Sequence, residues 1–169
     1  IIRLPVYQNY EFLADKPPAY FVEKEYNVKG VGLVLSGIVM TGEIKKGDKL
    51  RLGPFYDKFH NVTIRSIHNN FREEVPSLSA GCSGCIAIRL DQSANITRKM
   101  IKGGMRVVAP GAEECLYWRF RAKVLIQKHP TSISEGYEAF IHCGAANQIA
   151  KIETIITEKE TKILRLGDR

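Results

Sequence analysis

The stretch that decides the fold reads GVGLVLSGIVMTGEIKKGD and covers residues 30–48. Its apolar residues from Val31 to Met40 are typical of a strand rather than a helix. Gly37 lies inside that strand, where a glycine permits a bend or the close approach of another backbone, as the corners of a β-barrel require. The residues Lys46-Gly47-Asp48 form a typical turn sequence. The stretch therefore predicts a strand that leads through tight turns into a second strand.

Similar strand signals recur roughly every ten to twelve residues, separated by Gly, Pro, Asn or Asp. The predicted strands are 19–26, 31–40, 49–52, 59–71, 84–90 and 105–108, followed after Ala109-Pro110-Gly111 by 118–124, 137–142 and 149–157. Short strands at regular spacing predict an all-β fold, either a closed barrel or a sandwich. Pro17-Pro18 cannot continue a helix or a central strand, so it reads as the entry to the first domain.

The sequence after Ala109-Pro110-Gly111 alternates clearly between apolar and polar residues. Trp118, Phe120 and Val124 share one face of the predicted strand 118–124, while its cationic residues share the other. We expect the apolar face to lie in a core. The cationic face is either solvated or meets an acidic or RNA partner. Because about 59 residues are few for a complete barrel, we expect the second domain to be incomplete at its C-terminal end.

The composition is that of an ordinary globular protein with a basic surface. The net charge is +7 and the pI about 9.3, and most of the positive excess lies in residues 1–110. Such a surface attracts polyanions, of which nucleic acid is the commonest, although a basic domain can also be merely solvated. The longest apolar stretch is too short to span a bilayer as a helix, and from the first residues we expect no signal peptide.

Motifs for catalysis or cofactor binding are absent from the sequence. No phosphate-binding P-loop occurs, and Gly30-Val31-Gly32 lacks the third glycine and the following helix of a dinucleotide site. Cys82 and Cys85 have CxxC spacing, but no second pair completes a zinc site. We interpret the cysteines as small buried apolar residues in a reducing compartment. The chain itself is thus predicted to be no enzyme and to hold no metal or cofactor.

The glycine pattern of residues 30–48 resembles domain II of elongation factors Tu and 1A, where G-x-G-x-V-x-x-G-x-x-x-x-G-x-I-x-x-G-[DE] runs through the start of a β-barrel. The run Arg98–Gly104 is similar to the R-x-x-I-x-x-G hairpin of that family. The run His129–Tyr137 is similar to the H-P-x-x-I-x-x-G-Y sequence of domain III in the eukaryotic and archaeal branch. Ser66-Ile67-His68 and His142-Cys143-Gly144 also occur in the related GTP-binding protein 1 group, which the chain resembles most.

The resemblance implies two consecutive antiparallel β-barrels, of domain II and then domain III type. It predicts a linker from a GTPase domain over residues 1–17, a domain II-like barrel over 18–110 and an incomplete domain III-like barrel over 111–169. It further implies a cytoplasmic parent GTPase whose nucleotide domain binds GTP and Mg, with tRNA, the ribosome or both as partners. We expect neither a membrane nor DNA as a partner. The alternative is that the barrels serve a regulatory GTPase as a protein–protein scaffold.

The resemblance also supplies candidate RNA contacts. In the bacterial delivery factor a glutamate in the long strand helps to form the pocket for the terminal adenosine, and Ser66 stands at that position here. A serine hydroxyl forms hydrogen bonds but carries no charge, so aminoacyl-end recognition is absent or achieved differently. For each cation the alternative is a solvated charge, and for each glycine it is turn geometry. The candidates are Lys29, Gly30, Gly32, Arg65, Ser66, Arg98 and Lys99.

Overall fold

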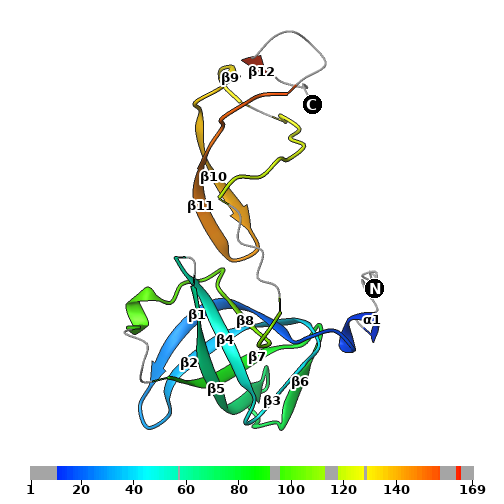
Figure 1. The fold of residues 1–169 in the computed structure, drawn as a ribbon, viewed down its shortest axis with the longest axis vertical. Helices are drawn as coiled ribbons and strands as arrows, with labels where there is room; N and C mark the ends of the chain where they lie inside the picture. The colour runs from blue at the N-terminus through cyan, green and yellow to red at the C-terminus, as the bar shows by residue number, and fades with distance from the viewer. Residues whose placement is uncertain are drawn as a thin grey trace, which may run out of the picture. The chain divides into compact units, whose positions relative to one another are not determined.

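The computed structural model describes residues 11–56, 58–91, 96–112, 118–127, 129–156 and 163–164. The chain divides into two compact units, residues 1–115 and residues 116–169, which we treat separately (Figure 1). The predicted all-β class is confirmed, since the described helices are the single-turn α1 (Glu11–Ala14) and the 3-10 turn η1 (Arg98–Met100). The exact domain boundaries stay a prediction.

The first unit is a closed six-stranded barrel, in which every pair of neighbouring strands is antiparallel (Figure 1). The order around the barrel is β1 (Ala19–Val28), β2 (Gly32–Thr41), β7 (Ser83–Leu90), β5 (Lys58–Asn69), β4 (Lys49–Phe55) and β8 (Arg106–Val108). All six correspond to predicted strands. A separate ribbon pairs β3 (Glu43–Lys45) with β6 (Ser77–Ser79). Neither was predicted, because three residues are too few to show a period of two.

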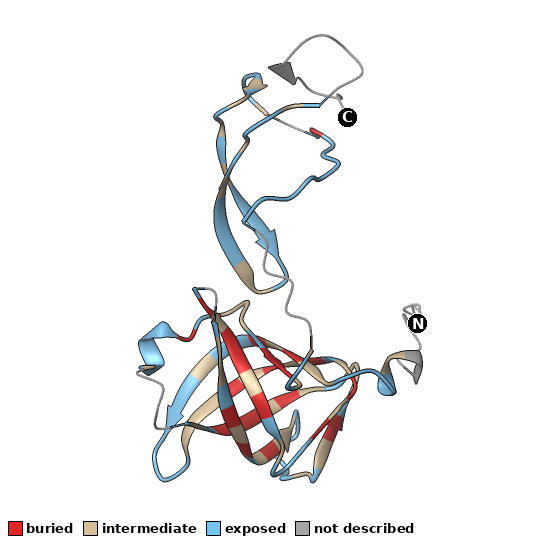
Figure 2. Cartoon of the chain, viewed as in Figure 1, coloured by how far each residue is buried: buried red, intermediate tan, exposed pale blue. Residues whose placement is uncertain are grey.

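Buried residues alternate with less buried ones along much of the barrel strands (Figure 2), and the buried apolar side chains form one core. The ribbon contributes to the same core, since Ile44 of β3 and Leu78 of β6 are buried with it. The largest fully buried side chains are Tyr20, Leu35, Ile44, Leu52, Ile64, Ile67, Ile86 and Ile101. Tyr20 is the one member of this set with a polar end, so its hydroxyl needs a partner inside the barrel.

The Tyr20 side chain extends from β1 into the barrel, where its ring lies against Gly37 of β2 and its hydroxyl reaches the backbone of Gly84 on β7. Gly37 and Gly84 lie opposite each other in the ladder between these strands. A Cβ at Gly37 would lie 2.9 Å from the Tyr20 ring and 2.0 Å from the carbonyl oxygen of Phe21. The Tyr20 hydroxyl donates a hydrogen bond to the carbonyl oxygen of Gly84 at 2.8 Å. The carbonyl oxygen of Leu35, a second possible acceptor, lies 3.1 Å from the same hydroxyl. Burial, with a smaller contribution from Cys85 and Glu23, raises the pKa of Tyr20 far above its usual range.

The second unit contains two short ribbons. One pairs β10 (Glu138–Cys143) with β11 (Ala146–Lys151), and the other pairs β9 (Ile133–Ser134) with β12 (Ile163–Leu164). Within the described residues these strands do not close into a barrel. His129 and Tyr137, the first and last residues of the H-P-x-x-I-x-x-G-Y run, meet edge to face, and His129 Nε2 lies 3.0 Å from the Tyr137 hydroxyl. That run therefore holds the approach to β10 in place.

The prediction of a strand over residues 118–124 with a buried apolar face is wrong. Residues 118–127 form no strand, and Trp118 and Phe120 are 85% and 63% exposed. An alternating pattern forms a half-buried strand only where a neighbouring strand pairs with it and a second layer covers its apolar face. The described part of the second unit offers ribbons of two strands, which provide no such layer.

The interpretation of the cysteines as buried residues is also wrong for two of the four. Cys82 and Cys143 are exposed and Cys85 is half-buried, all three as free thiols, while Cys115 lies outside the described residues. Cys82 occupies a tight turn before β7, where its N–H donates to the carbonyl oxygen of Ser79 at 3.0 Å. Cys143 ends β10, a strand whose residues are mostly exposed. Backbone position, rather than residue type, decides the exposure of both.

Replacing Tyr20 by phenylalanine tests the hydroxyl that spans the barrel. Tyr20→Phe removes a buried hydrogen bond while it keeps the ring, so we expect the free energy of unfolding to fall by about 1–1.5 kcal/mol. Urea titration followed by circular dichroism measures this. Tyr26→Phe is the matched control, because Tyr26 is 44% exposed and should change stability by less than about 0.5 kcal/mol. Equal stability of the two variants would contradict a role for the Tyr20 hydroxyl.

Adding one methyl group at Gly37 tests the close approach of β1 and β2. Because that methyl would collide with backbone atoms of Phe21, which cannot rotate away, Gly37→Ala should destabilise the barrel by about 1–3 kcal/mol or more. Ser36→Ala, next along the same half-buried strand, should stay within about 0.5 kcal/mol of the parent. The same urea titration reports both values. A Gly37→Ala protein as stable as the Ser36→Ala protein would show that the strands have room to separate.

Candidate nucleic-acid interface

The turn between β1 and β2 carries three of the predicted contacts, Lys29, Gly30 and Gly32. Gly30 and Gly32 have φ values of 82° and 99°, which L-residues with side chains rarely adopt, and no atom lies within 4 Å of a Cβ at either position. The N–H of Val31 donates to the carbonyl oxygen of Val28 at 3.0 Å and closes the turn. Backbone conformation, not crowding, therefore explains both glycines, and Lys29 stands exposed beside them.

The strand β5 carries the next two, Arg65 and Ser66, at a β-bulge. Its pairing with β7 shifts between Ile64 and Ser66, so Arg65 is the extra residue. The turn before β4 is hydrogen-bonded to Ile64 of β5, the residue that precedes the bulge. Gly47 donates its N–H to the carbonyl oxygen of Ile64 at 2.9 Å, and the N–H of Ile64 donates to the carbonyl oxygen of Asp48 at 2.9 Å. Arg65 is exposed and Ser66 half-buried as a result.

The hairpin turn and the bulge meet at a hollow of about 180 Å³ lined by Gly30, Val31, Arg65 and Ser66. The structure thus brings together three residues that the sequence predicts as RNA contacts, Gly30 from one part of the chain and the adjacent Arg65 and Ser66 from another. Val31 is a lining residue that sequence reasoning missed. Its position between two turn glycines was the available signal, because a residue there must face solvent.

Arg98 and Lys99 line a different hollow of about 610 Å³, together with Glu25 and Thr97. They belong to the turn η1, where the sequence predicted a hairpin. The Arg98 Nε atom lies 3.9 Å from a carboxylate oxygen of Glu25 on β1. The predicted contacts therefore form two groups rather than one, and Glu25 and Thr97 are lining residues that the sequence did not indicate.

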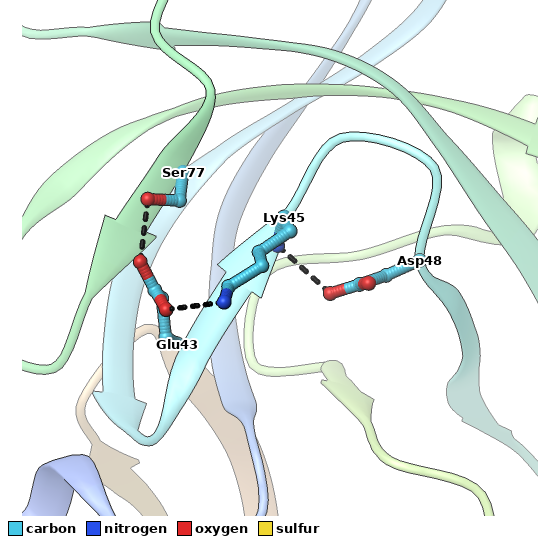
Figure 3. A network of polar contacts seen from close by, with 4 residues as sticks. All are labelled: Glu43, Lys45, Asp48 and Ser77. Carbon is cyan, nitrogen blue, oxygen red and sulfur yellow. Dashed lines mark hydrogen bonds and ion pairs between the residues drawn. The ribbon is translucent and has the colours of Figure 1, made fainter.

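A polar network supports the turn that holds the bulge (Figure 3). The Asp48 carboxylate accepts a hydrogen bond from the N–H of Lys45 at 2.8 Å. Lys45 Nζ lies 3.0 Å from the Glu43 carboxylate, which also accepts from the Ser77 hydroxyl at 2.5 Å. These hydrogen bonds, first that of Ser77 and then that of Lys45, lower the pKa of Glu43 below its usual value. The network links β6 through β3 to the turn.

Comparison with known proteins identifies the barrel. The family model described as elongation factor Tu domain 2 matches residues 32–105. The chain belongs to the elongation factor Tu/1A superfamily, and its barrel is a domain 2. GTP-binding protein 1 of Xenopus laevis is 35% identical over 156 residues, which cover 92% of this chain and 22% of that protein. Elongation factor 1-alpha of Desulfurococcus mucosus is 29% identical over 164 residues, which cover 91% of this chain and 35% of that protein.

A solved structure of Sup35 complexed with GMPPNP has the same fold, with a TM-score of 0.76 at 20% identity over 94% of this chain and 38% of that one. The chain therefore spans less than two-fifths of the length of each of these relatives. The domain 2 assignment confirms the predicted family. In the described ranges no helix is long and apolar enough to cross a membrane, and no group of three or more His, Cys, Asp or Glu side chains could hold a metal ion.

Removing the Ser77 hydroxyl tests the network. Ser77→Ala should raise the pKa of Glu43, measured by carboxyl carbon NMR, because its strongest hydrogen-bond donor is lost. A carboxylate with a lowered pKa stabilises the fold above the unfolded pKa of about 4.3, and this contribution disappears as the pH falls through the lower folded pKa. The variant should therefore be less stable than its parent at pH 7, and the difference should shrink near pH 3. An unchanged Glu43 pKa would contradict the network.

Proposed function

We propose that this chain is a non-catalytic, RNA-contacting part of an elongation-factor-like translational GTPase. The observation that carries the proposal is the hollow in which Gly30, Val31, Arg65 and Ser66 meet. The parent would bind GTP and Mg in a separate nucleotide domain and act in the cytoplasm. Residues 1–17 would link that domain to the domain 2 barrel, and residues 111–169 would belong to domain III. The two units would contact tRNA, ribosomal RNA or both, and their contacts would respond to the GTP state.

The lining of the hollow supplies the chemistry for one backbone segment of RNA. The Arg65 guanidinium and the nearby Lys29 ammonium can neutralise phosphates. The Ser66 hydroxyl can donate or accept a hydrogen bond with a ribose hydroxyl, and Val31 offers an apolar surface for a sugar or base. The glycines let the RNA approach the turn closely. Because Ser66 carries no charge, we expect the site to recognise shape and phosphate position rather than a particular base.

A titration with tRNA tests this proposal. The double variant Lys29→Ala/Arg65→Ala should weaken binding, and each lost phosphate contact should lower the salt dependence, the slope of log K against log[salt], by about one. Fluorescence anisotropy with labelled tRNA at several salt concentrations measures both quantities. Lys58→Ala/Arg106→Ala is the matched control, because it removes the same two charges from exposed positions that line neither hollow.

Two outcomes would contradict the proposal. Equal loss of affinity in the two double variants would indicate a general effect of positive charge. Affinity for tRNA no greater than for random RNA at every salt concentration would exclude tRNA delivery and favour the alternative, a protein–protein scaffold. Ser66→Ala separates the roles within the hollow. We expect it to lower affinity while it leaves the salt slope unchanged, since it removes hydrogen bonding but no charge.

A further inference from the structure

Among the residues that the structure describes, none pairs with the outer edge of β1 beyond Val22. The pairing of β1 with β8 covers only Ala19, Tyr20 and Phe21. The next residue of β1, Val22, exchanges backbone hydrogen bonds with Gly104 and Met105. A bulge follows, because the pairing of β1 with β2 shifts between Val22 and Lys24. From there to Val28, the described part of the chain pairs β1 with β2 alone. An unpaired strand edge presents free N–H and C=O groups and can accept another strand.

A cationic hollow lies beside this edge. It is the hollow of about 610 Å³ lined by Glu25, Thr97, Arg98 and Lys99. Its acidic residue, Glu25, already faces the Arg98 guanidinium at 3.9 Å, so the Lys99 ammonium remains as the excess charge in the lining. Outside the lining, the exposed Lys24 and Glu23 of β1 offset each other, so the net positive charge of the hollow is that of Lys99. The space next to the edge is therefore suited to a segment that carries carboxylates.

Exposed apolar side chains continue along the same strand. Tyr26 and Val28 are 44% and 42% exposed, while most other apolar side chains of the barrel strands are buried. Alternate side chains of an added strand would contact them on one face of the enlarged sheet. The edge thus combines free backbone groups, apolar contacts and a cationic hollow within one stretch of β1.

We propose that residues 23–28 of β1 accept an extended acidic peptide segment of a protein partner, which adds a strand to the barrel and places its carboxylates against Arg98 and Lys99. Backbone pairing provides the affinity and the two cations select acidic side chains. RNA fits this place less well, because a phosphate backbone cannot reproduce the alternating N–H and C=O groups that a strand edge pairs with. The partner site is separate from the hollow at Arg65.

A peptide titration tests this proposal. The probe is a fluorescein-labelled peptide in which glutamate alternates with threonine, added to the ¹⁵N-labelled chain. We expect saturable binding by anisotropy, with NMR shifts of the amides of residues 23–28 and 97–99. Arg98→Glu/Lys99→Glu should reduce the affinity roughly tenfold or more, because two exposed attractive contacts are lost and replaced by repulsion. Lys49→Glu/Lys58→Glu is the control with an equal change of charge outside both hollows.

A second peptide separates strand pairing from simple charge attraction. Replacing the alternate threonines by proline keeps the charge but removes N–H donors, so this peptide should bind much more weakly. Equal binding of both peptides would overturn the proposal, as would amide shifts elsewhere or no saturable binding. If Arg98→Glu/Lys99→Glu weakens tRNA binding and leaves peptide binding unchanged, the hollow is an RNA contact instead. Variants at Lys29 and Arg65 should leave peptide binding unaffected.

Discussion

The barrel depends on the space that one glycine, Gly37, leaves for the ring of Tyr20. Gly37 and Gly84 face each other across β2 and β7, and the Tyr20 ring lies where a side chain at Gly37 would stand. The hydroxyl reaches the carbonyl oxygen of Gly84 and so joins β1 to a strand that is not its neighbour. A barrel of six strands has a narrow interior, so one large residue can fill its width only if the opposing positions are small.

The unequal lengths of the barrel strands determine where the two proposed partner surfaces lie. β1 and β2 are longer than β8, so their hairpin extends past the point where β8 ends. One consequence of this extension is that the turn at Gly30 lies next to the bulge of β5 at Arg65. The other is the unpaired edge beside Arg98. A single hairpin therefore serves both surfaces, one through its turn and one through its free edge, because strand lengths around the barrel are unequal.

Much of this could be predicted from sequence, where local chemistry decides the outcome. The turn glycines and the close approach at Gly37 follow from residue type, and the six barrel strands follow from regular spacing. The ribbon of β3 and β6 could not be predicted, because it exists through long-range pairing. The grouping of Arg65 with Gly30, apart from Arg98, depends on strand order around the barrel. The prediction that Trp118 lies in a core was wrong, because an alternating apolar pattern does not by itself provide a second layer to cover the apolar face.

The bulge at Arg65 has a consequence for how such a domain can diversify. The position of residue 65 is determined by backbone atoms of Gly47, Asp48 and Ile64, and by the shift in pairing with β7. None of these interactions uses the side chain at 65. Substitution there changes the chemistry offered to a partner and leaves its place in space unaltered. Related domains can therefore carry different side chains at this position, and so contact different partners, without a change in the barrel backbone.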